Sequence, residues 1–268
     1  MSKATDQNYL RGEQYQDAAN LNARIALHQR FGTANIGWHP WVFEQLDLPT
    51  EARVLELGCG PGLLWGQNLE RLPPGWQVTL SDFSLGMVEQ ARRNLAPSGY
   101  PFTFGQLDAQ VLPFASGRFD AVIANHMLYH VPDRQKTYAE VRRVLKPEGR
   151  FYAATMSRDN MKQVADLERL CGFTSDLGAF SQAADFFFLE NGEAELRAWF
   201  PQLAVRRQEE TLVVTEAQPL IDYILSGTSV AGLSDETLSR LRVEISAEIG
   251  RTGAFRIDKM TGLFIGEG

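Results

Sequence analysis

Between Glu51 and about Met156 the chain alternates short apolar runs with amphipathic segments, and this alternation constrains the fold more than any other feature. In the segment RQKTYAEVRRVLK, for example, Tyr138, Val141 and Leu145 fall on one helical face. Strands that alternate with helices at this pitch form parallel βαβ units. We therefore predict a doubly wound, Rossmann-like α/β fold. The predicted strands are ARVLELGCGPG (running into a glycine turn), WQVTLSDFS, PFTFGQLDA, GRFDAVIANH and GRFYAATM.

The segments on either side of this region have a different pattern. Apolar residues and His28 recur at helical spacing before Gly32, which predicts a helix. We expect a helical N-terminal cap at 1–50 and a core at 51–268 with a helical insertion at about 158–200. After the insertion we predict a strand (VRRQEETLVVTE), two helices (QPLIDYILS and DETLSRLRVEISAEIG) and a closing strand, FRIDKMTGLFIGE, with a turn or kink near Thr261–Gly262.

The composition of the 268 residues is that of an ordinary globular protein, 44% hydrophobic and 22% charged. A net charge of −7 without any Lys/Arg cluster disfavours a nucleic-acid partner. The two cysteines lack metal-ligand spacing, which fits a reducing compartment. The polar start MSKATDQNYL has no apolar core of a signal peptide, and no run is apolar enough to span a membrane. We expect a cytoplasmic monomer or homodimer that acts on a small molecule.

A glycine loop, VLELGCGPG, directly follows the first predicted strand and contains Gly58, Gly60 and Gly62. Glycine lets the backbone turn sharply and lets a ligand approach main-chain N–H groups where the next helix begins. The dinucleotide fingerprint G-x-G-x-x-G would need a glycine at Leu63. This spacing disfavours a dehydrogenase.

The segment LELGCGPG resembles motif I of the class I S-adenosylmethionine-dependent methyltransferases, especially the group that includes ubiquinone and menaquinone biosynthesis enzymes. The resemblance covers about residues 51–155. It implies a seven-stranded, mostly parallel sheet, S-adenosylmethionine as cofactor and S-adenosylhomocysteine as product. Two acids at the ends of the next two strands match the family as well, Asp82 in TLSDFS and Asp108 in QLDAQVLPF.

An acid beside the glycine loop can accept hydrogen bonds from both ribose hydroxyls. The resemblance assigns this role to Asp82, with Phe83 packed against the adenine. It places Asp108 at the adenine amino group, with the N–H of Ala109 nearby. The residues predicted to bind the cofactor all lie in or after a strand end: Glu56, Gly58, Gly60, Asp82, Phe83, Asp108, Ala109 and Asn125.

The end of the fourth strand, ANHMLYHVPD, lies where the family places the reactive methyl group. Related amino methyltransferases have Asp/Asn-Pro-Pro-Tyr/Phe there, whereas this chain has Asn125-His126-Met127-Leu128, which argues against a nucleobase amino substrate. Catechol-type O-methyltransferases supply a metal-binding aspartate there, and Asn125 would replace it poorly. We therefore expect no metal site.

His126 and His130 stand four residues apart, so they would share one face if the segment were helical. A zinc pair would need further ligands. For His126 two interpretations stay open: a base or orienting group for the substrate, and simple packing. For His130, before Val-Pro-Asp, we expect a structural role in the turn.

Methyl transfer from a sulfonium mainly requires positioning of the nucleophile and exclusion of water. We expect the aromatic-rich cap to act as a lid, with Tyr15 and His28, beside His126, as the candidate catalytic residues. The leading hypothesis is direct in-line methyl transfer to a small, apolar or aromatic metabolite. The alternative is a non-catalytic or non-methylating S-adenosylmethionine-binding protein of the same fold.

Overall fold

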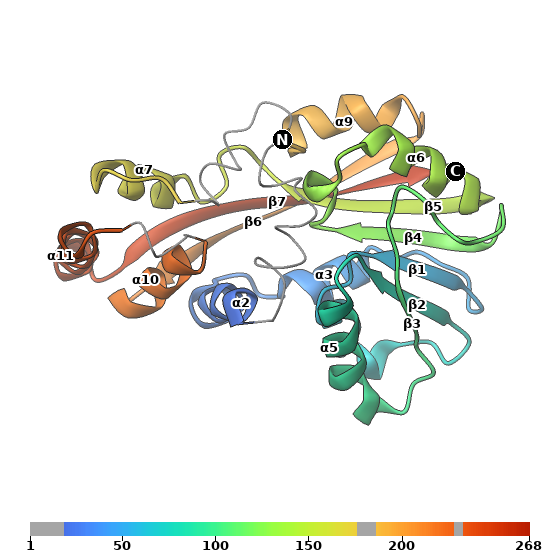
Figure 1. Cartoon of the computed structure of the whole chain (residues 1–268), viewed down its shortest axis with the longest axis horizontal. Helices are drawn as coiled ribbons and strands as arrows, with labels where there is room; N and C mark the ends of the chain where they lie inside the picture. The colour runs from blue at the N-terminus through green and yellow to red at the C-terminus, as the bar shows by residue number, and fades with distance from the viewer. Residues whose placement is uncertain (1–18, 176–185, 228–232) are drawn as a thin grey trace.

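The computed structural model describes residues 19–175, 186–227 and 233–268. Within them, seven strands form one sheet in the order β3-β2-β1-β4-β5-β7-β6 (Figure 1). β1 to β5 run parallel, and β7 is antiparallel to both of its neighbours. The predicted fold class is confirmed. The strands are β1 (Arg53–Leu57), β2 (Gln77–Asp82), β3 (Thr103–Gln106), β4 (Phe119–Asn125), β5 (Leu145–Met156), β6 (Leu203–Val214) and β7 (Phe255–Glu267).

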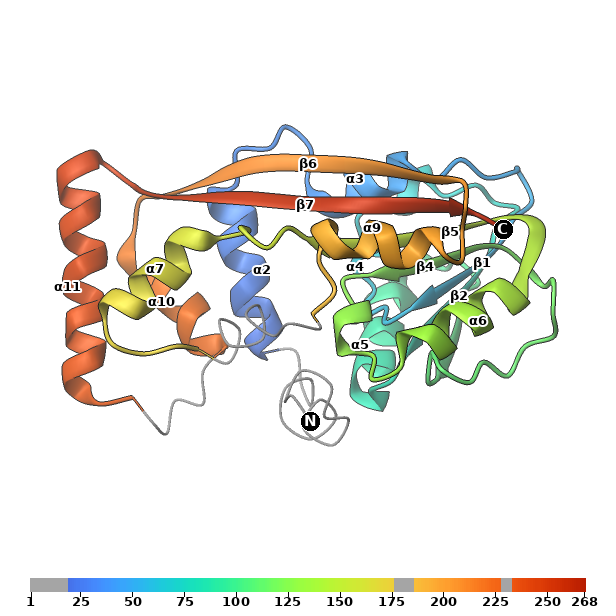
Figure 2. The same cartoon turned by 90° about the horizontal axis from the view of Figure 1, so that it is seen from above.

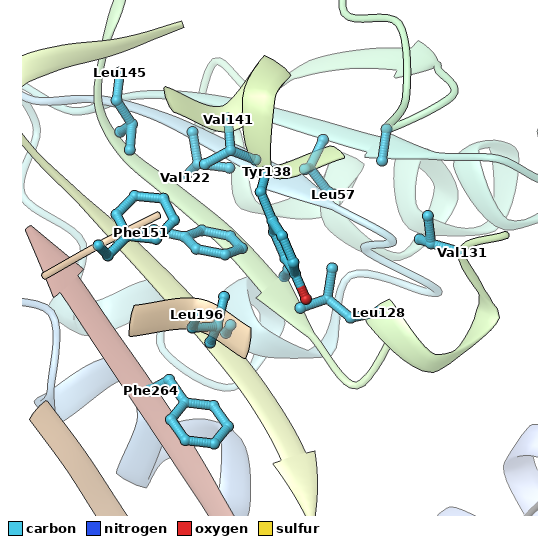
Figure 3. Packing of buried hydrophobic residues seen from close by; sticks show 14 of the residues in the cluster. Leu57, Val122, Leu128, Val131, Tyr138, Val141, Leu145, Phe151, Leu196 and Phe264 are labelled. Atoms are coloured by element: carbon cyan, nitrogen blue, oxygen red, sulfur yellow. The ribbon is translucent and has the colours of Figure 1, made fainter. Parts of the chain in front are cut away.

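Helices cover both faces of the sheet (Figure 1). On one face α6 (Arg134–Val144) and α9 (Leu189–Arg197) bury apolar side chains. Tyr138 of α6 is wholly buried there (Figure 3). Its hydroxyl donates to Oε1 of Glu195 at 3.1 Å. On the other face lie α3 (Trp38–Glu44), α4 (Leu63–Gly66) and α5 (Leu85–Leu95). Covering both faces is what allows the central strands β1 and β4 to be buried along almost their whole length.

The helix after the glycine loop is shorter than its sequence indicates. The pattern LLWGQNLERL predicts one helix, but α4 ends at Gly66 and a separate turn of 3₁₀ helix spans Leu69–Arg71. Asn68 interrupts the helix because its side-chain amide donates to the carbonyl oxygen of Leu64 at 2.6 Å. The single-helix prediction is therefore wrong.

β6 and β7 form a long antiparallel ribbon that extends beyond the rest of the sheet (Figure 2). Residues 255–260 of β7 pair with β6 alone, and pairing with β5 begins at Thr261. The turn or kink predicted near Thr261–Gly262 is wrong, since β7 is continuous there. Gly262 is instead a place of close approach: a Cβ on it would lie 2.7 Å from Cδ2 of Leu189.

The ribbon module is our name for this extension (residues 208–214 and 255–260) together with four helices packed on it (Figures 1 and 2). The helices are α2 (Ala19–Phe31), α7 (Lys162–Leu170), α10 (Ala217–Ser226) and α11 (Asp235–Thr252). α2 and α10 are joined by Arg24, which donates to Oγ and to the carbonyl oxygen of Ser226 at 3.1 and 2.9 Å. The module has its own apolar cluster, in which Leu27 and Ile257 are wholly buried. None of the described helices is long and apolar enough to cross a membrane.

Candidate functional site

A cavity of about 740 Å³ joins the carboxyl ends of β1, β2 and β4 to the ribbon module. This volume is within the usual range for small-molecule sites. The glycine-loop end of the cavity is formed by strand-end residues of the sheet, including Glu56, Gly60 and Asp82. The module end is formed by residues of α2, α7, α10, β6 and β7, including His28 and Lys259.

The glycine loop has the backbone conformation that only glycine adopts easily. Gly58 and Gly60 have φ values of 67° and 52°. A Cβ on Gly58 would lie 2.6 Å from Cβ of Met127, so a side chain there would clash. A Cβ on Gly60 would meet nothing within 4 Å, and Gly60 lines the cavity. The loop therefore leaves room for a ligand against the main chain.

Asp82 connects the end of β2 to the glycine loop. Its Oδ2 accepts the N–H of Gly60 at 2.9 Å, and its Oδ1 accepts the N–H of Ser84 at 2.8 Å. Burial raises the pKa of Asp82, while these backbone hydrogen bonds oppose the rise. Each oxygen retains acceptor capacity for a ligand hydroxyl, because a carboxylate oxygen accepts more than one hydrogen bond.

Glu56 is the most buried acid of the glycine-loop end, with 2% of its surface exposed. Its Oε2 accepts the indole N–H of Trp65 at 2.6 Å. Burial raises the pKa of Glu56 to about 8; the Trp65 hydrogen bond opposes the rise and the charge of Asp82 adds to it. Without a ligand, Glu56 is therefore mostly protonated at neutral pH. A cationic ligand group beside it would favour the carboxylate.

The other residues predicted for this end also line the cavity. Phe83 follows Asp82 directly, and Asp108 and Ala109 lie in the turn after β3. Oδ1 of Asp108 accepts the backbone N–H of Gln110 at 2.9 Å, which fixes the carboxylate at the cavity wall. The structure thus brings together all the predicted cofactor-binding residues, although they come from four strand ends.

Asn125 and His126 lie between the two ends of the cavity. Oδ1 of Asn125 accepts the indole N–H of Trp38 at 3.0 Å, which ties α3 to the end of β4. The ring of His126 packs on Trp38, with centroids 4.9 Å apart. His126 has φ +56°, and the other described non-glycine residue with positive φ, Met161, also lines the cavity. Such backbone strain is often found at functional sites.

His126 and His130 do not lie on one helix. β4 ends at Asn125, and His130 ends a short 3₁₀ turn, Leu128–His130, where its N–H donates to the carbonyl oxygen of Met127 at 2.9 Å. Burial, with smaller contributions from His39 and Lys259, lowers the pKa of His126 to about 3. His126 is therefore a neutral imidazole at neutral pH.

Of the two candidates from the cap, Tyr15 lies outside the described residues, and His28 of α2 lines the module end. The ring of His28 meets Tyr223 edge-on at 5.8 Å. Its Nδ1 is buried and has no hydrogen-bond partner among the residues that the structure describes. Burial, then Lys259 and His126, lower the pKa of His28 to about 3, so it is also neutral.

Lys259 and Glu210 of the module end carry no motif and are not identified from the sequence, whereas Phe186 belongs to the aromatic segment expected in the cap. Lys259 and Glu210 form an ion pair on the cavity wall, each with 11% of its side chain exposed. Phe186 stacks on Tyr129, with centroids 4.7 Å apart and an interplanar angle of 11°. Within the described ranges, no group of three or more His, Cys, Asp or Glu side chains has the arrangement of a metal site.

A family model described as a methyltransferase domain matches residues 55–153, which contain the whole glycine-loop end. These residues form a methyltransferase domain. Among the relatives of the chain is the ubiquinone/menaquinone biosynthesis C-methyltransferase UbiE of Desulfotalea psychrophila, 38% identical over 113 residues. That match covers 42% of this chain and 45% of the relative, so the two are alike over less than half of either.

The solved structures extend the likeness beyond the methyltransferase domain. The phosphoethanolamine N-methyltransferase 2 of Haemonchus contortus, in complex with S-adenosyl-L-methionine, has a TM-score of 0.59 at 17% identity. The match covers 97% of this chain and 59% of that one. The cyclase SpnF has a TM-score of 0.58 at 16% identity, with 94% of both chains covered. At such identities the likeness shows the fold alone.

Proposed function

We propose that the chain transfers the methyl group of S-adenosylmethionine to a nucleophilic atom of a small apolar or aromatic molecule, without a metal ion. The observation that carries the proposal is the continuity of the cavity. It joins a glycine loop and strand-end acids to neutral imidazoles and aromatic side chains. The methyltransferase domain at 55–153 supports the proposal.

The glycine-loop end fits this cofactor. The open space beside Gly60 accepts a ligand at van der Waals distance from the main chain. Asp82 would accept the ribose hydroxyls, and Asp108 would accept the adenine amino group. Phe83 would pack on the adenine, and the buried carboxyl of Glu56 would face a cationic group. When bound, the cofactor supplies a methyl group already activated on a sulfonium.

The residues between the two ends would prepare the nucleophile. His126 is held by its backbone and by Trp38, so its neutral ring has a fixed direction. It would accept a hydrogen bond from the incoming group, and its proton where that group carries one. Trp38 and His28 would exclude water once the substrate is in place. The apolar wall at Met156, Met161 and Phe186 would contact the body of the substrate.

The test is turnover of purified protein with S-adenosylmethionine and a panel of phenols, carboxylic acids and amines. Formation of S-adenosylhomocysteine together with a methylated product supports the proposal, and turnover should be unchanged by a chelator. If magnesium is needed to restore turnover after chelation, the metal-free mechanism is wrong.

A second candidate is a protein that binds S-adenosylmethionine and does not transfer its methyl group. The fold likeness to a structure named as a cyclase, over 94% of both chains, is the observation that keeps it open. The same assay separates the two functions. The second candidate predicts tight binding of S-adenosylhomocysteine, no methylated product, and substrate conversion, if any, without loss of the methyl group.

A further inference from the structure

The ammonium of Lys259 stands at the module end with a single charged partner. Lys259 and Glu210 are directly opposite in the β6–β7 register, and both line the cavity. Oε2 of Glu210 also accepts the N–H of Ala34 at 3.3 Å. An ammonium has three N–H donors. Among the described residues Lys259 has only Glu210 as a hydrogen-bond partner, so two donors are available at the cavity wall.

Burial raises the free-energy cost of leaving these N–H donors without an acceptor. An ammonium with 11% of its side chain exposed has lost most of its hydration, and one carboxylate replaces only part of it. Glu210 is fixed by the backbone of the cap at Ala34, so the ion pair holds the ammonium in one place. A ligand oxygen with negative charge would complete its coordination.

Apart from Glu210, the titratable groups found close to Lys259 in the described part of the chain are two neutral imidazoles. His28 and His126 both lie within electrostatic range of it. Nδ1 of His28 is buried without a partner, and a bare lone pair is tolerated better than an orphaned N–H. The proton of His28 therefore belongs on Nε2. His28 and Lys259 together give the module end two kinds of N–H donor.

Both carboxylates of the module end already have a partner in the protein. Glu210 is paired with Lys259, and Oε2 of Glu168 accepts the N–H of Ser175 at 3.0 Å. Burial raises the pKa of Glu168, which favours its neutral form. The remaining acids of the cavity, Glu56, Asp82 and Asp108, lie at the glycine-loop end. The glycine-loop end thus holds three acids, whereas at the module end Lys259 has donors to spare and the two acids are paired or favoured in the neutral form.

We propose that the module end binds an anionic oxygen of the substrate, and that Lys259 is the residue that selects it. The substrate class is an apolar or aromatic acid, with a carboxylate or an ionised phenol. This inference rests on the proposed function, because it names the substrate of the same site. An amine is disfavoured, since Lys259 would repel an ammonium group, Glu210 is already neutralised by Lys259, and burial favours the neutral form of Glu168.

The test measures binding of matched ligands to the full chain saturated with S-adenosylhomocysteine. The probes are benzoate, 4-hydroxybenzoate and naphthalene-2-carboxylate, each beside its carboxamide and its aminomethyl analogue. We expect at least one acid to bind, at least tenfold more tightly than its carboxamide, and the amines not to bind. An amine that binds more tightly than its acid, or no acid binding at millimolar concentration, would overturn the proposal.

Variants locate the effect at Lys259. Lys259→Met leaves Glu210 buried and unpaired and can fail to fold, so the main variant is Lys259→Met with Glu210→Gln, which removes both charges. Acid binding should fall at least tenfold in the double variant and should be largely kept in Lys259→Arg. Unchanged acid binding in a folded double variant would contradict the proposal. Affinity for S-adenosylhomocysteine, measured in parallel, should be the same in the variants and the native protein. If the native protein does not bind S-adenosylhomocysteine, the proposed function is refuted instead.

Discussion

The two ends of the cavity are supplied by the chain in different ways. The glycine-loop end takes its residues from successive strand ends, at 56–60, 82–83 and 108–109, and the end of β4 adds Asn125 and His126 between the two ends of the cavity. The carboxyl ends of parallel strands meet at one edge, so short segments suffice. The module end takes its residues from α2, α7, α10 and the β6–β7 ribbon, which are far apart in the sequence, from Arg24 to Thr261. It exists only once the long-range pairing of the ribbon has formed.

The two ends also differ in charge, and the difference suggests a division of labour. Acids gather around the glycine loop, where a cationic cofactor is proposed to bind. Neutral His28 and the Lys259–Glu210 ion pair lie at the other end, where the substrate is proposed to bind. If this division is correct, substitutions at one end should change one binding event and leave the other nearly intact. The following predictions test it, from the largest expected effect to the smallest.

Replacing His126 should have the largest effect on turnover. We expect His126→Gln to lower kcat by about 10²-fold, the lower end for loss of a general base, because a ring with a pKa of about 3 is a weak base. For the same reason turnover should not fall through protonation of His126 between pH 7 and pH 5. His130→Gln is the matched control and should retain most of the activity. Equal losses in the two variants would show that His126 has no special role.

Asp82→Ala should weaken binding of S-adenosylhomocysteine by about 1.5–3 kcal/mol, the range for hydrogen bonds to a charged group. This is about 10- to 150-fold in affinity. Calorimetry on the folded variant measures it. Asp120→Ala is the control, because Asp120 is a strand residue that does not line the cavity. If Asp82→Ala binds the ligand as the native protein does, another residue holds the ribose.

Cofactor affinity should depend on pH through Glu56. In the free protein its pKa is raised to about 8, so binding of a cationic group beside it releases a proton. The complex then holds fewer protons than the free protein, and affinity rises with pH until about 8, by up to about tenfold per pH unit. Glu56→Gln should remove this dependence. Calorimetry in buffers of different ionisation enthalpy measures the proton release, and a flat profile between pH 6 and pH 8.5 would contradict the assignment.

His28→Ala should lower turnover severalfold and leave the melting temperature nearly unchanged. The physical reason is that Nδ1 of His28 makes no hydrogen bond that the substitution would break. Arg30→Ala, on the same helix but outside the cavity lining, is the control. Tyr15→Phe should also lower turnover in the same assay.

Amide exchange in 19–35 should slow when S-adenosylhomocysteine binds, as expected of a lid. Full protection of this segment without ligand would show that it is structural.

The strand-end acids could be predicted because the alternating pattern fixes where each parallel strand ends. Asp82 and Asp108 follow apolar runs whose length and composition are enough to place them. The interruption of the helix after the glycine loop could not be predicted in this way. It depends on one side-chain hydrogen bond, from Asn68 to Leu64, that competes with the helical pattern.

Lys259 and Glu210 could not be paired from the sequence because their contact depends on the register of an antiparallel ribbon. The alternation of buried and exposed residues along the two strands nevertheless points to both residues. Side chains two apart on a strand share a face, so Lys259 lies on the face of the wholly buried Ile257, and Glu210 on that of Leu212. A charged residue on the buried face of a strand needs a partner or a ligand. The alternation, followed to the end of the chain, would have singled out both residues.

The most direct test of the account is calorimetric titration of the purified chain with S-adenosylhomocysteine, with NAD as the control. The glycine loop, Asp82 and Asp108 form a nucleoside site in which Leu63 replaces the third glycine of the dinucleotide fingerprint. We predict binding of one S-adenosylhomocysteine per chain with micromolar affinity and no measurable binding of NAD. Tight binding of NAD without binding of S-adenosylhomocysteine would contradict the central claim.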